Sequence, residues 1–282
     1  MITLKNESLT VAINELGAEL KSVLCDGTEY LWNGDPAFWS GTAPMMFPIC
    51  GTLKEDRYTY EGKEYHLNKH GFARNTLFAV ESLEADRVVF LHTSDEKTKQ
   101  CYPFDYELRV RFTLQGRAIE IGYEVTNKSG KTMYFNVGSH EAYATPEGIE
   151  AYDVIFPESQ TLYTSALQGP LMTDALIPIL KDASVLPLCE RYFEMDTLVF
   201  KSIKSRSATL RNRKNGRAIR VDFPDADHLL IWHKQGAPYI CLEPWNGLPD
   251  FVGTSFALCE KEGITALEKD GVYRNTHTVT LL

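Results

Sequence analysis

The sequence predicts an all-β protein, an antiparallel sandwich of large sheets with few and short helices. Apolar and polar residues alternate with a period of two along many short segments, as in strands that bury one face. Turn-forming dipeptides such as Glu61-Gly62 and Asn215-Gly216 separate several of these segments. No helical period persists for about 12 residues, so helices are expected to contribute little.

The expected strands of the first half of the chain are the most regular ones. They are residues 9–13, 57–67 (a hairpin that turns at Glu61-Gly62), 87–93, and 106–127 (a hairpin that turns at Gln115-Gly116). In the second hairpin, apolar residues alternate on both sides of the turn, so one face of it should be buried. Ser94 is expected to cap a brief helix before Pro103.

The second half is less regular. Strands are expected at residues 131–138, 196–203, 210–223 (a hairpin around Asn215-Gly216), 228–233, 239–243 and 277–282. Residues 167–187 show no steady alternation, which predicts a long loop. A helical turn or two is expected around residues 189–193.

Composition bounds the kind of protein. The 282-residue chain is 44% hydrophobic and 24% charged, typical of a globular protein, and we expect one domain over residues 1–282, as a monomer or homodimer. A formal net charge of -9 with scattered Lys and Arg argues against nucleic acid as a partner. No apolar run is long enough for a membrane span or a signal peptide. The six cysteines include no C-x-x-C pair, which favours free thiols in the cytoplasm and no zinc knuckle.

One carboxylate occupies an unusual position in the stretch YICLEPWNG, residues 239–247. If residues 239–243 form a strand, Ile240 and Leu242 face one side, and Glu243 faces the other. Pro244 lacks a backbone donor, so we expect the strand to end there. Glu243 would then be partly buried, an environment that raises a carboxyl pKa toward the range of a general base. The alternative is a structural carboxylate paired with an Arg.

Two further stretches contain histidines. In KTMYFNVGSHEAYA, residues 131–144, the polar face carries Asn136 and His140, and Gly138 between them leaves room for a ligand. In HLNKHGFAR, residues 66–74, His70 and Arg74 share a face, and the guanidinium offers a rigid fork of donors to a ligand with several hydroxyls. The alternatives are a structural histidine and an Arg that stacks on Phe or pairs with a surface acid.

These stretches together resemble the aldose 1-epimerase, or galactose mutarotase-like, family, and in particular its LacX-type subgroup. The resemblance spans nearly the whole chain, with FPICG at 47–51, HGFAR at 70–74, GSHEAY at 138–143 and CLEPWNGLPD at 241–250 in order. It implies a β-supersandwich whose concave sheet face holds a hexose. It also implies chemistry that needs no metal and no other cofactor.

The resemblance assigns roles as well. His140 matches the general acid that protonates the ring oxygen, and Glu243 matches the general base that takes the proton of the anomeric hydroxyl. The ring opens, the aldehyde end rotates, and reclosure gives the other anomer. His70 and Arg74 match residues that contact the sugar or line the pocket, and we add Asn136 and Trp245 as binding residues. We expect the imidazole and the carboxyl group to face each other across a hollow that a six-membered sugar can fill.

Two positions depart from the family pattern. Thr52 stands where an arginine is usual, which removes an expected sugar contact, and Glu141 stands where a proline or small residue is usual, next to the expected acid. No residue clearly matches the family carboxylate that holds sugar hydroxyls, and neither Asp225 nor Asp227 is assigned to it. Trp232 is a second aromatic residue that could cover the C–H face of the sugar, although a place in the core is the favoured alternative for it.

Several functions stay open at this level. Within the family, the substrate is a free hexose or a phosphorylated one, with Arg74 as one cation for a phosphate. A sugar-binding module without turnover would keep the same pocket. A glycoside hydrolase needs two carboxylates, and only Glu243 is a clear candidate. A metal enzyme using His70, His140, His228 and His233 is disfavoured, because His228 and His233 would lie on opposite faces of one strand.

Overall fold

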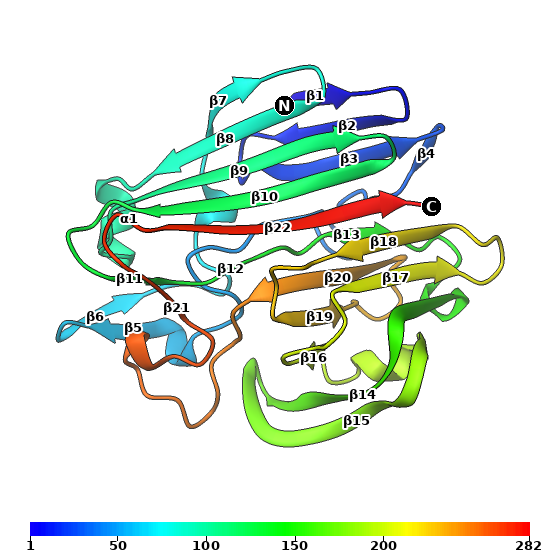
Figure 1. The fold of residues 1–282 in the computed structure, drawn as a ribbon. Coiled ribbons are helices and arrows are strands. Elements are labelled where there is room, and N and C mark those ends of the chain that lie inside the picture. The colour runs from blue at the N-terminus through cyan, green and yellow to red at the C-terminus, as the bar shows by residue number, and fades with distance from the viewer.

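Strands dominate the computed structural model, which describes residues 1–282, and the named strands pair antiparallel throughout. The largest sheet has nine strands in the spatial order β15 (Leu171–Pro187), β14 (Tyr152–Gln168), β17 (Ser207–Asn212), β18 (Ala218–Asp222), β22 (Val272–Leu281), β10 (Ala118–Asn127), β9 (Tyr106–Gln115), β8 (Arg87–Thr93) and β7 (Ala79–Leu83). Figure 1 shows it running from β7 at the top to β15 at the bottom.

Smaller sheets complete the sandwich. One contains β12 (Val137–Gly138), β20 (Tyr239–Asn246), β19 (His228–Trp232) and β16 (Thr197–Phe200), and β13 (Ala142–Ala144) also pairs with β20. A second contains β1 (Ile2–Lys5), β2 (Leu9–Asn14), β3 (Glu19–Cys25) and β4 (Thr28–Glu29). Two ribbons pair β5 (Arg57–Tyr60) with β6 (Lys63–His66) and β11 (Met133–Phe135) with β21 (Thr265–Leu267).

Helices are few and short, as the sequence predicts. The single α-helix is α1 (Glu96–Cys101), and five 3-10 turns lie at η1 (Lys54–Asp56), η2 (Ala73–Asn75), η3 (Ile149–Ala151), η4 (Glu190–Phe193) and η5 (Leu258–Glu260). The N-cap of α1 is Asp95 and not the expected Ser94, because the Asp95 carboxylate accepts the backbone N–H of Thr98 and forms a capping box. No helix has the length and apolarity needed to cross a membrane.

A continuous core joins the sheets. It comprises 62 buried residues and draws on strands from β1 to β22. The expected alternation is clearest in β9, where every second side chain from Tyr106 to Leu114 is buried. The predicted antiparallel sandwich is therefore confirmed.

Three expected boundaries were wrong. Residues 167–187 are not a loop, because β15 covers most of them and pairs with β14 through several register shifts, which break the alternation that would have revealed it. The expected strand at 131–138 divides into β11 and β12, which join different sheets. Strand β20 also continues past Pro244 to Asn246.

The continuation of β20 has a physical reason. The Pro244 carbonyl accepts the N–H of Ser139, so the proline nitrogen points to the same side of the strand. On that side the ladder is interrupted, because β12 ends at Gly138 and β13 begins at Ala142. The missing proline N–H therefore falls where regular pairing is already broken, and the strand loses little by including it.

Candidate active site

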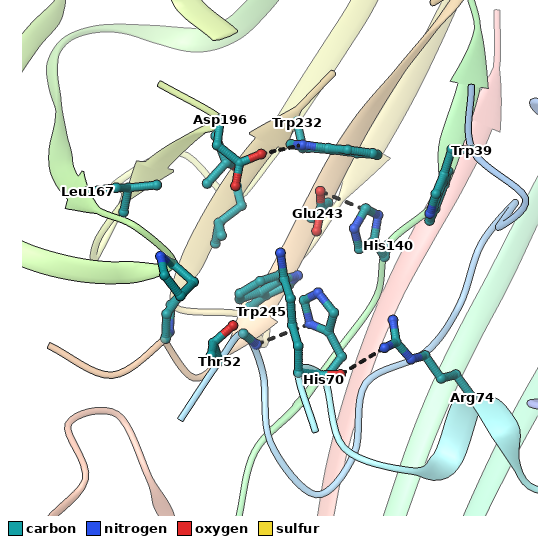
Figure 2. Close-up of a pocket in the computed structure, with 16 residues that line it drawn as sticks. Trp39, Thr52, His70, Arg74, His140, Leu167, Asp196, Trp232, Glu243 and Trp245 are labelled. Atoms are coloured by element: carbon teal, nitrogen blue, oxygen red, sulfur yellow. Dashed lines mark hydrogen bonds and ion pairs between the residues drawn. The ribbon is translucent and has the colours of Figure 1, made fainter. Parts of the chain in front are cut away.

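The interrupted ladder beside β20 brings the two expected catalytic residues together. Gly138 pairs with Trp245 before the interruption, and Ala142 pairs with Cys241 after it. The same register places His140 opposite Glu243, and residues directly opposite each other in an antiparallel pair share a face. Nδ1 of His140 lies 3.4 Å from Oε1 of Glu243, as the dashed line in Figure 2 marks.

This pair lies at the floor of a pocket of about 260 Å³. His70, Arg74 and Trp245 also line the pocket, so five of the six expected site residues are brought together. The two catalytic candidates are adjacent and do not face each other across a sugar-sized hollow as expected. Two oxygens bonded to the same sugar carbon would both be within reach of groups this close.

Asn136 is the expected site residue that does not line the pocket. It lies between β11 and β12, fully buried, and its side-chain amide donates to the Gly263 carbonyl at 2.7 Å. The expectation assumed one unbroken strand from 131 to 138, and the change of sheet at this point removes the shared face. Gly138 also serves a different purpose from the expected one, because a Cβ there would lie 2.8 Å from the Trp245 ring. The space therefore accommodates protein side chains.

Burial governs the protonation of the catalytic candidates. His140 is 8% exposed and Glu243 is 1% exposed. Desolvation lowers the pKa of His140 to about 3, and the nearby ammonium of Lys69 acts in the same direction. Desolvation raises the pKa of Glu243 well above its ordinary value, while Lys69 lowers it and Glu141 raises it. The pair therefore holds one proton over a broad pH range.

His70 is held as a hydrogen-bond donor. Its Nδ1 accepts the backbone N–H of Gly51 at 3.1 Å, and desolvation lowers its pKa well below the ordinary value. A neutral ring that accepts at Nδ1 carries its proton on Nε2, so Nε2–H is free to donate to a ligand. His70 adopts a φ of 68°, an uncommon backbone conformation that is often associated with functional sites. Gly71 next to it has no alternative, because a Cβ would lie 2.3 Å from the Phe47 carbonyl oxygen.

Aromatic rings surround His140. Trp39 lies against the imidazole with ring centroids 4.9 Å apart, and Trp232 meets it edge-on at 5.4 Å. Figure 2 shows Trp232 and Trp39 beside His140. Of the two alternatives for Trp232, the structure favours the pocket: the ring lines it, partly buried, and packs against a small core cluster behind it. Such faces can cover the C–H surface of a sugar.

Sequence reasoning missed several lining residues. Trp39 belongs to a loop, where two successive aromatic residues shortly after Pro36 were a usable signal. Asp196 directly precedes β16, and its carboxylate accepts the indole N–H of Trp232 at 2.9 Å. Lys69 directly precedes His70, and Leu167 comes from the end of β14, inside the segment expected to be a loop.

The two departures from the family pattern have different locations. Thr52 lines the pocket and is 8% exposed, where it offers a hydroxyl in place of a guanidinium. Glu141 points away from the pocket, and its Oε1 lies 3.1 Å from Nε2 of His277. Two other histidines considered as metal ligands, His228 and His233, lie outside the pocket. His228 accepts the N–H of Ser202, and His233 contacts Glu190.

Donor atoms for a metal ion are found in one grouping at the pocket floor. The candidate ligand atoms of His140, Cys241 and Glu243 all lie within 4.8 Å of one another, and Cys241 is on the same face of β20 as Glu243.

The sheets and this pocket define a galactose mutarotase-like β-sandwich protein. The family model described as aldose 1-epimerase matches residues 1–263, and the chain belongs to that family. The protein LacX (plasmid) of Lactococcus lactis subsp. lactis is 35% identical over 296 aligned residues, which cover 100% of this chain and 99% of the relative. These matches confirm the resemblance, including the LacX-type subgroup.

Solved structures agree with this assignment. A galactose mutarotase related enzyme from Lactobacillus acidophilus superposes with a TM-score of 0.95 at 32% identity, covering 100% of this chain and 97% of that one. A galactose mutarotase-like protein from Lactobacillus casei gives a TM-score of 0.94 at 30% identity, with 100% of both chains covered. Family membership and these neighbours support a mutarotase-type role.

Proposed function

We propose that the protein is an aldose 1-epimerase that interconverts the α and β anomers of a hexose. The observation that carries the proposal is the adjacency of His140 and Glu243, 3.4 Å apart at the pocket floor. Opening a hemiacetal requires one proton to leave the anomeric hydroxyl and another to reach the ring oxygen. Both oxygens are bonded to the anomeric carbon, so two adjacent groups that share one proton can serve both of them.

In the proposed mechanism, the proton that burial favours on Glu243 first passes to the adjacent His140. His140 then protonates the ring oxygen while Glu243 accepts the proton of the anomeric hydroxyl. The C1–O bond to the ring opens, the aldehyde end rotates, and the reverse transfers close the ring on its other face. Nε2–H of His70 donates to a sugar oxygen, and Arg74 and Asp196 are available to its hydroxyls. Trp245 packs against the sugar.

Polarimetry on pure hexose anomers tests the proposal. We expect His140→Ala and Glu243→Gln each to lower kcat by about 10²- to 10⁴-fold, the usual effect of losing a general acid or base. His66→Ala is the matched control, because His66 is exposed on β6 and lies outside the pocket. Rates of both variants equal to that of the His66 control would reject the roles of His140 and Glu243.

A phosphorylated hexose is the second candidate substrate, favoured by the cations of the pocket. Lys69 and Arg74 both line it, and Arg74 donates only to the Lys69 carbonyl, at 2.9 Å. Neither cation forms an ion pair with a carboxylate, which leaves both charges available to a phosphate. Comparing kcat/KM for hexose and hexose 6-phosphate separates the candidates, since Lys69→Met and Arg74→Met should weaken turnover of the phosphate far more.

A sugar-binding module without turnover is the remaining alternative. It predicts saturable hexose binding by calorimetry and no anomer interconversion above the buffer rate. We further propose that residues 1–282 act as one domain, because one core cluster includes strands from both ends of the chain.

A further inference from the structure

A carboxylate lies buried directly behind the candidate acid. Glu141 is 2% exposed and follows His140 in the chain. Since successive side chains of extended backbone point to opposite sides, His140 faces the pocket and Glu141 faces the space between the sheets. There Glu141 is surrounded by apolar side chains, among them Leu20, Ile119 and Val279.

The Glu141 carboxylate forms one hydrogen bond that crosses the sandwich. Oε1 accepts from Nε2 of His277 at 3.1 Å, and the two side chains are 3% and 1% exposed. His277 belongs to β22, the central strand of the nine-stranded sheet, whereas Glu141 belongs to the segment between β12 and β13. The bond therefore ties the catalytic segment to the opposite sheet.

Backbone bonds fix the two ends of the segment that carries His140: Gly138 and Met46 exchange two bonds, and the N–H of Ala142 donates to the Thr42 carbonyl at 2.9 Å. Between Gly138 and Ala142 the regular ladder to β20 is interrupted, as described above. Ser139 contributes two bonds, since its N–H donates to the Pro244 carbonyl at 3.3 Å and its carbonyl accepts the indole N–H of Trp245 at 3.0 Å. The Glu141–His277 bond is the side-chain anchor directly after His140, ahead of the backbone bonds of Ala142.

Stability alone does not explain this pair. Oε2 of Glu141 and Nδ1 of His277 are both buried without a hydrogen-bond partner. An apolar pair of similar volume would avoid these two unsatisfied atoms and is often as stable as a buried polar pair or more so. A buried polar contact with two unsatisfied atoms is better explained by a role in fixing the position of the segment that carries Glu141.

We propose that Glu141 is a positioning residue, which, through its bond to His277, holds the backbone of residues 138–142 so that His140 stays opposite Glu243. This inference rests on the proposed acid–base function. The charge of Glu141 also acts on the groups around it: it raises the pKa of Glu243 after the larger effects of burial and Lys69. The phenols of Tyr123 and Tyr143 and the thiol of Cys241 are the other titratable groups that sense it.

A set of variants separates an effect of Glu141 on the position of His140 from an effect on the stability of the protein. We expect Glu141→Leu to lower kcat by about tenfold to a hundredfold, as small misplacements of catalytic groups do, with KM changed by less than about twofold. The double variant Glu141→Leu/His277→Leu removes both partners, so the melting temperature should recover while kcat stays low. Tyr143→Phe is the control, because it removes a neighbouring hydroxyl that has no partner, and it should leave kcat unchanged.

The isosteric variant Glu141→Gln tests the charge. Its amide oxygen still accepts from His277, so kcat should remain close to the wild-type value. Loss of the negative charge removes one cause of the raised pKa of Glu243, so the alkaline limb of the pH profile of kcat/KM should move to lower pH. Recovery of kcat together with stability in the double variant, or an unmoved pH profile in Glu141→Gln, would overturn the proposal.

A separate readout distinguishes failure of this inference from failure of the proposed function. If the wild-type protein does not interconvert anomers, the proposed function is rejected. Amide hydrogen exchange of residues 138–142 then tests whether the Glu141–His277 bond holds this segment. Faster exchange in Glu141→Leu than in Tyr143→Phe supports it, and equal exchange rejects it. If Glu141→Leu does not fold, the double variant and Glu141→Gln decide the matter by the same measurements.

Discussion

At the scale of residues, the proposed chemistry depends on two side chains whose burial disfavours their charged forms. The imidazole of His140 and the carboxyl group of Glu243 both lose hydration, which favours their neutral forms. The pair shares one proton, which can reside on either group. Either arrangement supplies one acid and one base, as a reaction that runs in both directions requires.

The first prediction at this scale concerns pH. Activity requires the singly protonated pair, so kcat/KM should fall when the pair gains a second proton or loses its only one. Because burial lowers the pKa of His140 to about 3, we expect activity to persist well below pH 6.5 and to be lost on approach to about pH 3. The alkaline limb follows the raised pKa of Glu243. Polarimetry across pH measures both limbs; an acid limb near pH 6.5 would contradict this description.

The second prediction concerns the stability cost of Glu243. Its pKa is raised in the folded state, so the folded protein binds its proton more tightly than the unfolded chain does. The resulting stability is present below the ordinary Glu pKa and is lost as pH rises through the folded value, by about 1.4 kcal/mol per pKa unit. Glu243→Gln should therefore melt at a higher temperature than the wild type near neutral pH.

The stability gain of Glu243→Gln should shrink as pH falls toward the ordinary Glu pKa. Thermal unfolding at several pH values checks this trend, with the exposed residue change Glu194→Gln as the control. A gain that is the same at every pH would show that ionisation of Glu243 is not its cause.

At the scale of elements, loops and hairpins from distant parts of the chain form the pocket walls around β20. The tip of the β14–β15 hairpin contributes Leu167 and Pro170, and the loop after β20 contributes Pro249. Backbone bonds join these two walls, because the N–H of Met172 donates to the Asp250 carbonyl and the N–H of Val252 donates to the Met172 carbonyl. The hairpin that sequence reasoning missed is therefore part of the site.

The third prediction tests the buried ion pair that holds this loop. Nζ of Lys261 lies 2.7 Å from Oδ1 of Asp250 and also donates to the Leu248 carbonyl. Lys261→Met leaves the Asp250 carboxylate buried without its cation, which should cost about 3–5 kcal/mol of unfolding free energy. Urea denaturation measures it. The control is Lys201→Met, which removes an exposed ion pair with Glu262 and should cost about 1 kcal/mol or less.

At the scale of the whole molecule, one core cluster spans the sandwich. The N-terminal strands β1 to β3 and the C-terminal strand β22 both contribute buried residues to it, and Figure 1 shows β22 in the middle of the large sheet. Strand β22 is therefore central to the fold. The two sides of the nine-stranded sheet are joined only where this strand pairs with β10 and β18.

The fourth prediction follows from this arrangement. If residues 1–282 are one domain, unfolding should be a single cooperative transition by calorimetry, and deletion of residues 272–281 should abolish it, because β22 links β10 to β18. Two resolved transitions in the intact chain would show instead that the halves of the nine-stranded sheet fold independently.

Local sequence patterns predicted several hairpins and three residues of the pocket. Period-two alternation and turn dipeptides are properties of neighbouring residues, so the hairpins β5–β6, β9–β10 and β17–β18 were predictable. The motifs around His70, His140 and Glu243 identified these three residues, all of which line the pocket. Register shifts hid the β14–β15 hairpin, since each bulge reverses the alternation on which the prediction depends.

The sequence by itself determined the class of fold and the family, and it singled out the two residues that we propose as the acid–base pair. Only the tertiary structure decided which side chains surround that pair: it moved Asn136 into packed protein, brought in Trp39, Lys69 and Asp196, and paired Glu141 with His277. The reason is that strand pattern depends on residues next to each other in the chain. A pocket depends on which sheet each strand joins and where a ladder is interrupted, and those are fixed only when distant segments pack together.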